Sequence, residues 1–175
     1  EERINLLKQS FGLLKKYTIC PYNQKVLIEI GLLSFIENLN KKEECHIYSL
    51  ALDVLKNCTY NETVVQILIS SSYFDYFIEE VLNFYENSQI INENEIHKIC
   101  FDYNNIILNN IIKSNQGFES LLNKIGFKKI LLIGKDNENI NLLNNIVINL
   151  NEKLQNPKQN QILNISELIN DILDI

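Results

Sequence analysis

Residues 23–57 hold the pattern that decides the fold, and they read NQKVLIEIGLLSFIENL, then NKKEE, then CHIYSLALDVLKN. Apolar residues recur at helical spacing on both sides of Gly31, so we expect two short helices that meet at this glycine. Glycine suits such a junction because it reaches positive φ without a Cβ clash. The polar residues 40–44 then predict a turn, followed by a longer helix that closes near Asn57.

The same arrangement recurs further along the chain. The asparagines that open and close this segment are 34 residues apart (57 − 23), and a second pair at 115 and 149 is also 34 apart (149 − 115). A third pair, at 61 and 110, is 49 apart (110 − 61). The polar stretch 86–95 can hold the 15 additional residues (49 − 34) as an inserted loop. Internal repetition of this kind is the sequence signature of stacked helical repeats.

We therefore expect one all-α domain over residues 1–175. Its repeats are expected at 23–58, 61–113 and 115–154, with the end of a partial repeat at 1–20 and a C-terminal capping helix at 157–175. The expected helices are 23–30, 32–40, 44–58, 62–71, 73–86, 93–113, 116–125, 127–134, 138–154 and 160–175. Pro21 separates residues 1–20 from the first repeat, because proline lacks an amide donor and clashes with the preceding turn.

Composition narrows the class of function. The chain has 175 residues, is 46% hydrophobic and 22% charged, and contains only 5 Gly and 2 Pro, which favours a globular helical protein over one with many tight turns. The net charge of −6 disfavours neutralisation of nucleic-acid phosphates. No apolar run reaches the length of a membrane span. We expect a cytoplasmic protein, with a nuclear location as the alternative.

The cysteines and histidines do not predict a metal or catalytic site. The cysteines are Cys20, Cys45, Cys58 and Cys100. None forms a Cys-x-x-Cys pair, so we expect small buried apolar side chains in a reducing compartment. His97 and Cys100 share a helix face, but a structural zinc needs four ligands. Nothing places a histidine beside a nucleophile, so we expect no enzyme, no cofactor and no metal.

The repeating segment resembles an armadillo repeat, as found in catenins and importin-α. The resemblance covers about residues 18–154 and is carried by Gly31 and Gly126 at helix junctions and by Ala51 and Asn57 in the third helix. It implies a right-handed α-solenoid, in which each repeat buries its faces against its neighbours and the third helices line a concave groove. Another α-solenoid, such as one built of HEAT repeats, is the alternative.

The resemblance also implies a binding surface on the open face of the third helices. The candidate residues are Asp53, Lys56, Asn57, Tyr60, Asn109, Asn110, Lys113, Asn145, Asn149 and Glu152. An asparagine offers both an amide donor and a carbonyl acceptor, so it can pair with the backbone of an extended peptide. In importin-α-like proteins the groove asparagine works beside a Trp four residues earlier. Asp53, Ile106 and Asn145 stand at those places and the chain has no Trp, so nuclear-localisation-signal binding of that kind is not expected.

A structural role for these asparagines is the alternative, in which they cap helix ends or brace one repeat against the next. The expected function is non-catalytic protein binding, as a scaffold or adaptor, with an extended peptide or helix as the partner. The acidic net charge favours a partner with Lys or Arg. A chaperone cofactor that embraces a folded domain is the other candidate. Tyr73, Tyr76 and Tyr85 are expected to be partly exposed and could add binding energy.

Overall fold

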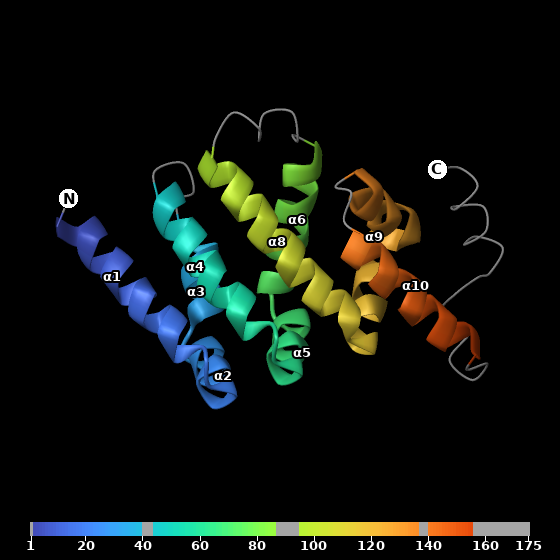
Figure 1. Ribbon diagram of the computed structural model, residues 1–175, viewed down its shortest axis with the longest axis horizontal. Coiled ribbons are helices and arrows are strands. Elements are labelled where there is room, and N and C mark those ends of the chain that lie inside the picture. The colour runs from blue at the N-terminus through green and yellow to red at the C-terminus, as the bar shows by residue number, and fades with distance from the viewer. Residues whose placement is uncertain (1, 40–43, 87–94, 137–139, 156–175) are drawn as a thin grey trace. The chain divides into compact units, whose positions relative to one another are not determined.

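The computed structural model describes residues 2–39, 44–86, 95–136 and 140–155, which are helical with no strand among them (Figure 1). The helices are α1 Glu2–Tyr17, α2 Pro21–Glu29, α3 Leu32–Glu37, α4 Cys45–Cys58, α5 Glu62–Ser70, α6 Tyr73–Glu86, α8 Glu95–Lys113, α9 Asn115–Asp136 and α10 Ile140–Gln155. The chain divides into two compact units, an N-terminal unit over Glu1–Asn110 and a C-terminal unit over Ile111–Ile175.

The all-α prediction is confirmed, and the expected helices agree closely with the observed ones. The break inside α9 at Gly126 separates the two helices expected at 116–125 and 127–134. Helix α2 begins at Pro21, two residues before the expected start, because proline is well suited to the first turn of a helix. The helix expected at 160–175 and most of the insertion expected at 86–95 lie outside the described residues.

Gly31 and Gly126 are the glycines at positive φ within the described residues, as the sequence predicted for both junctions. Gly31 has φ 105° and ψ 25°, which is the left-handed helical region. Gly126 has φ 77° and ψ 162°, a region that essentially only glycine occupies. The two junctions therefore need glycine for different backbone conformations.

Asparagine should distinguish these two glycines. Asparagine visits the left-handed helical region more readily than other residues with a Cβ, so Gly31→Asn is expected to cost about 1 kcal/mol. Gly126→Asn is expected to cost about 3 kcal/mol, because its backbone region excludes a Cβ. Urea denaturation followed by circular dichroism measures both losses, and equal losses would contradict the two conformations.

The core of the N-terminal unit is centred on α4, which packs against α1, α2 and α3. Leu52, Val54 and Leu55 of α4 have no exposed surface. Helices α1 and α4 and the part of α8 in this unit run in the same direction (Figure 1). The expectation that Tyr73 is partly exposed is wrong, since it is 1% exposed in α6, which packs against α3 and α5. Tyr76 and Tyr85 are half-buried.

The core of the C-terminal unit lies between α9 and α10. Phe118 and Leu121 of α9 and Leu142 and Ile146 of α10 have no exposed surface. The first turn of α9 approaches the end of α8 very closely at Gly117. A Cβ added at Gly117 would lie 2.1 Å from the backbone oxygen of Ile111, so only glycine fits at this contact.

Candidate functional site

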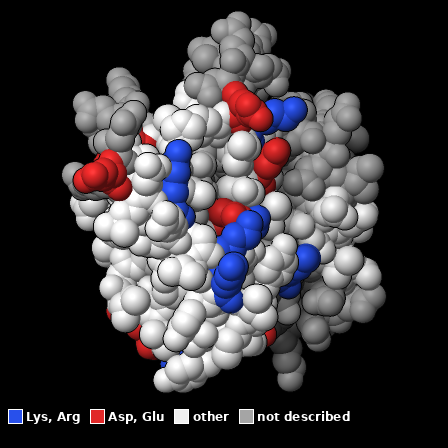
Figure 2. Space-filling view, turned by 60° about the vertical axis from the view of Figure 1, so that its left-hand side comes forward, with Lys and Arg blue, Asp and Glu red and all other residues white. Residues whose placement is uncertain are grey.

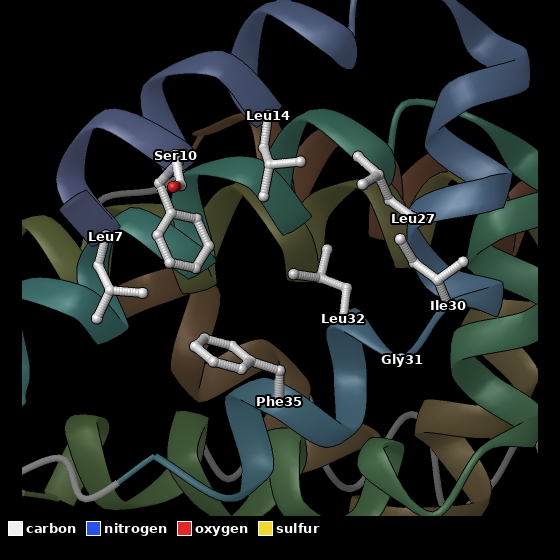
Figure 3. Close-up of a pocket in the computed structure, with 9 residues that line it drawn as sticks. Leu7, Ser10, Leu14, Leu27, Ile30, Gly31, Leu32 and Phe35 are labelled. Atoms are coloured by element: carbon white, nitrogen blue, oxygen red, sulfur yellow. The ribbon is translucent and has the colours of Figure 1, made fainter. Parts of the chain in front are cut away.

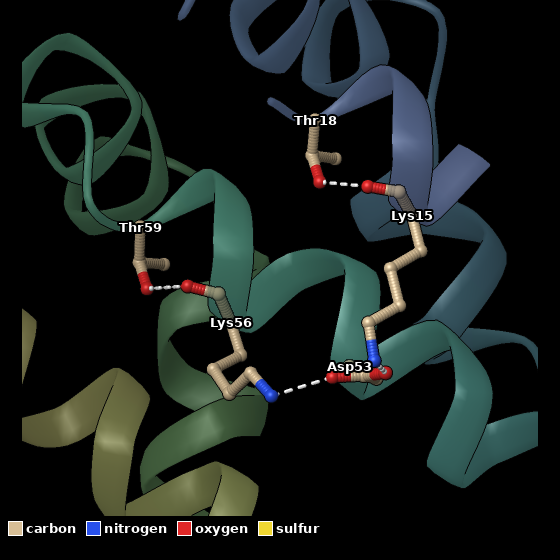
Figure 4. A network of polar contacts seen from close by, with 5 residues as sticks. All are labelled: Lys15, Thr18, Asp53, Lys56 and Thr59. Carbon is tan, nitrogen blue, oxygen red and sulfur yellow. Dashed lines mark hydrogen bonds and ion pairs between the residues drawn. The ribbon is translucent and has the colours of Figure 1, made fainter. Parts of the chain in front are cut away.

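Asp53 of α4 lies between two lysines at the open side of the third-helix positions (Figure 4). Its carboxylate is 2.6 Å from the Lys15 ammonium of α1 and 2.5 Å from the Lys56 ammonium of its own helix. Lys56 also stands over the ring of Tyr103 of α8, 4.1 Å from the ring centre. The side chain of Asp53 is 8% exposed. One nearly buried carboxylate thus ties α1 and α4 together, and Lys56 extends the contact to α8.

The charges of this network reinforce one another. Burial raises the pKa of Asp53, but the hydrogen bonds from Lys15 and Lys56 outweigh it and hold the pKa below its ordinary value. The hydrogen bond to Asp53 in turn raises the pKa of Lys15. The charge of Asp53 is therefore neutralised inside the fold, and this predicted binding residue holds helices together.

The C-terminal ends of α1 and α4 are built in the same way (Figure 4). The hydroxyl of Thr18 donates to the carbonyl oxygen of Lys15 at 2.6 Å, and that of Thr59 donates to Lys56 at 2.8 Å. Both ends carry the pattern Lys-x-x-Thr, 41 residues apart (56 − 15). The sequence held this signal, but a search that started from asparagines did not find it. It makes α1 the local equivalent of α4.

Asn110 and Asn149, which were predicted to face a partner, are 6% and 4% exposed. The Asn110 amide donates to the hydroxyl oxygen of Thr59 at 3.1 Å. The Asn149 amide donates to the carbonyl oxygen of Ile112 at 2.7 Å and to that of Asn145 at 2.9 Å. Thr59 lies two residues beyond Asn57, and Ile112 lies two residues beyond Asn110. Each asparagine thus braces its helix against the end of the previous third helix, which is the structural role weighed as the alternative.

The other predicted residues differ in how far they reach solvent. Tyr60, just beyond α4, is 64% exposed, and Lys113 at the end of α8 is exposed. The half-buried members are Lys56, Asn57, Asn109 and Asn145. Glu152 belongs to α10, but its side chain lies outside the described part of the chain. Ile148 of α10, on the same side of the helix as Asn145, is 54% exposed.

An apolar groove in the N-terminal unit escaped the sequence reasoning (Figure 3). It lies between α1 and the junction of α2 with α3, and its volume is about 270 Å³. The walls include Leu7, Phe11 and Leu14 of α1 and Leu27, Leu32 and Phe35 opposite. The signal for it was that α1 carries apolar residues on more than one face, with Leu6 and Leu13 among them.

The cysteines divide into two classes. Cys58 and Cys100 are buried, and burial raises the pKa of each thiol to about 12. Cys45 is half-buried, whereas Cys20 is exposed between α1 and α2, so the expectation of a buried side chain is wrong for Cys20. In the part of the chain that the structure describes, no cluster of three or more His, Cys, Asp or Glu could hold a metal ion. No described helix combines the length and apolar character needed to cross a bilayer.

The chain matches no protein-family model, no curated protein and no solved structure. Two surfaces of the molecule therefore carry the functional argument. One is the row of residues on the third helices, and the other is the apolar groove beside α1.

Proposed function

We propose that the chain is a non-catalytic protein-interaction module, a right-handed α-solenoid of armadillo-like repeats. Its third helices α4, α8 and α10 would offer a surface to an extended peptide or helix of another protein. The repeated brace carries this proposal: Asn110 bonds to Thr59, and Asn149 bonds to Ile112 at the equivalent place. Stacked repeats require such recurring contacts, because each repeat buries its faces against its neighbours.

Partner contact would fall to exposed residues beside the bracing asparagines. Tyr60 is 64% exposed at the end of α4, and Ile148 is 54% exposed on α10. Tyrosine is enriched among residues that dominate interface energies, because a large amphipathic ring loses little rotamer entropy. Asn110 and Asn149 would then position the helices rather than touch the partner.

The charge of the surface supports a basic partner segment, as the net charge of −6 does. Asp53 would not pair with that segment, because Lys15 and Lys56 already neutralise it. Asp102 of α8 is exposed next to Tyr103 in sequence, and Glu95 is exposed at the start of the same helix. We expect a Lys or Arg of the partner to pair with Asp102.

Site-specific photo-crosslinking tests this proposal without unfolding the chain. A photoreactive amino acid is placed at Tyr60 and, separately, at Ile148. Matched controls carry it at Tyr22 of α2 and at Val147 of α10, which are 75% and 62% exposed but lie off the third-helix surface. We expect light-dependent adducts to the same partner protein at Tyr60 and Ile148 and not at the controls. Equal adducts at all four positions, or none at Tyr60 and Ile148, would refute the proposed surface.

A further inference from the structure

The groove beside α1 has nothing polar left to satisfy (Figure 3). Ser10 supplies the hydroxyl in its lining, and that hydroxyl donates to the carbonyl oxygen of Leu6 at 2.9 Å. The rings of Phe11 and Phe35 approach to 5.7 Å across the groove. Phe35 is 39% exposed and Ile30 at the rim is 73% exposed, so the apolar lining reaches solvent. Contact with apolar side chains is favourable here, by roughly 25 cal/mol for each Å² removed from water.

An apolar stripe on α1 continues the groove outward. Leu6, Leu13 and Tyr17 are 66%, 65% and 62% exposed. Leu6 and Leu13 lie four residues before and three residues after Ser10, so all three share a side of the helix. Contiguous exposed apolar patches are uncommon on monomeric proteins, and larger ones mark interaction sites. The groove and the stripe together form one continuous apolar arc on α1.

Lysines border this arc. Lys8 and Lys16 are exposed and lie on opposite edges of the arc by helical geometry. The acidic residue of α1 is Glu2, in its first turn. On the facing helix α2, Lys25 and Glu29 pair with each other at 3.4 Å and so add no net charge. Figure 2 brings the α1 side forward and shows Lys and Arg side chains gathered on a largely uncharged surface.

We infer that this groove docks an amphipathic segment of another protein, with apolar side chains in the groove and acidic side chains along its flanks. The acidic flanks would face Lys8 and Lys16, and complementary charge would set the choice of partner. A second copy of the chain fits less well. Two copies joined symmetrically through this patch would set the lysines of one against the lysines of the other. The inference concerns a surface separate from the third-helix surface.

Three synthetic helical peptides test the inference, measured by fluorescence anisotropy with the full chain. All carry the same leucine stripe, and their other positions are Glu, Gln or Lys. We expect the Glu peptide to bind about tenfold more tightly than the Gln peptide, the Lys peptide to bind most weakly, and the preference to shrink in high salt. The charge-neutral double variant Lys8→Gln with Lys16→Gln should remove the preference for Glu. Lys129→Gln, at an exposed lysine of α9, should leave it unchanged.

The site of binding is checked by one exposed residue and a matched neighbour. Ile30→Gln removes an apolar side chain of the groove and should weaken binding of the Glu peptide about tenfold. Tyr22→Gln changes an equally exposed residue outside the lining and should not. Equal affinity for the three peptides, no binding of any, or insensitivity to Ile30→Gln would overturn the inference. So would a dimer in sedimentation that Ile30→Gln converts to a monomer, because the occupant would then be a second copy.

Discussion

Gly117→Ala is expected to destabilise the C-terminal unit by about 4 kcal/mol, among the largest effects of a single substitution. The added Cβ would lie 2.1 Å from the oxygen and 2.9 Å from the carbonyl carbon of Ile111. These are backbone atoms at the end of α8, so no side chain can turn away to make room. The first turn of α9 must instead move, which also strains the hydrogen bond from the Gly117 amide to the Ser114 hydroxyl. Urea denaturation followed by circular dichroism measures the loss.

Gly12→Ala is the matched control, because it makes the same change where space is open. Nothing lies within 4 Å of a Cβ added at Gly12, which is exposed inside α1. Alanine favours a helix over glycine, so Gly12→Ala is expected to stabilise the protein by about 0.5–1 kcal/mol. A loss of stability at position 12, or wild-type stability in Gly117→Ala, would show that the α8–α9 contact is not as tight as described.

Asp53→Ala is expected to lower the free energy of unfolding by about 3 kcal/mol. The substitution leaves the ammonium groups of Lys15 and Lys56 near each other without the carboxylate that neutralises them. Lys15 is 54% exposed and can turn to water, but Lys56 is 15% exposed and packs over Tyr103. The uncompensated charge of Lys56 therefore dominates the cost. Chemical denaturation at neutral pH measures the difference from wild type.

The pH dependence of that difference separates charge from packing. The pKa of Asp53 is lower in the folded state than the ordinary value of about 3.9. The stability that its charge contributes is therefore complete above about pH 4 and is lost as pH falls through the folded pKa. We expect the gap between wild type and Asp53→Ala to be constant near neutral pH and to narrow below about pH 4. A gap that stays constant to low pH would assign the effect to packing alone. Asp53→Asn, which keeps the size but not the charge, should show the same narrowing.

The helices and their junctions could be predicted because their signals are local. Apolar spacing sets each helix, and the glycines at 31 and 126 stand where the backbone needs positive φ. These signals depend on neighbours within a turn or two of the chain. Tyr73 shows the limit of such reasoning, because an aromatic residue at the start of α6 reads the same whether packing buries it or leaves it exposed.

The candidate site could be predicted only as a set of positions. Asp53, Asn110 and Asn149 were placed on the correct helices, but their partners lie 37 to 51 residues away along the chain. Which polar group is buried depends on how two helix ends approach each other, and local spacing carries no information about that approach. Gly117 was missed for the same reason, since its backbone conformation is ordinary and only the nearby Ile111 carbonyl requires glycine.

The two asparagine braces differ in the kind of acceptor they use. Asn110 depends on the side-chain hydroxyl of Thr59, whereas Asn149 uses a backbone oxygen at Ile112, which every residue possesses. As the sequence drifts over evolutionary time, positions 59 and 110 should therefore change together, while position 112 should vary independently of 149. Covariation at one junction and its lack at the other would be the record of this difference among descendants of the same ancestral gene.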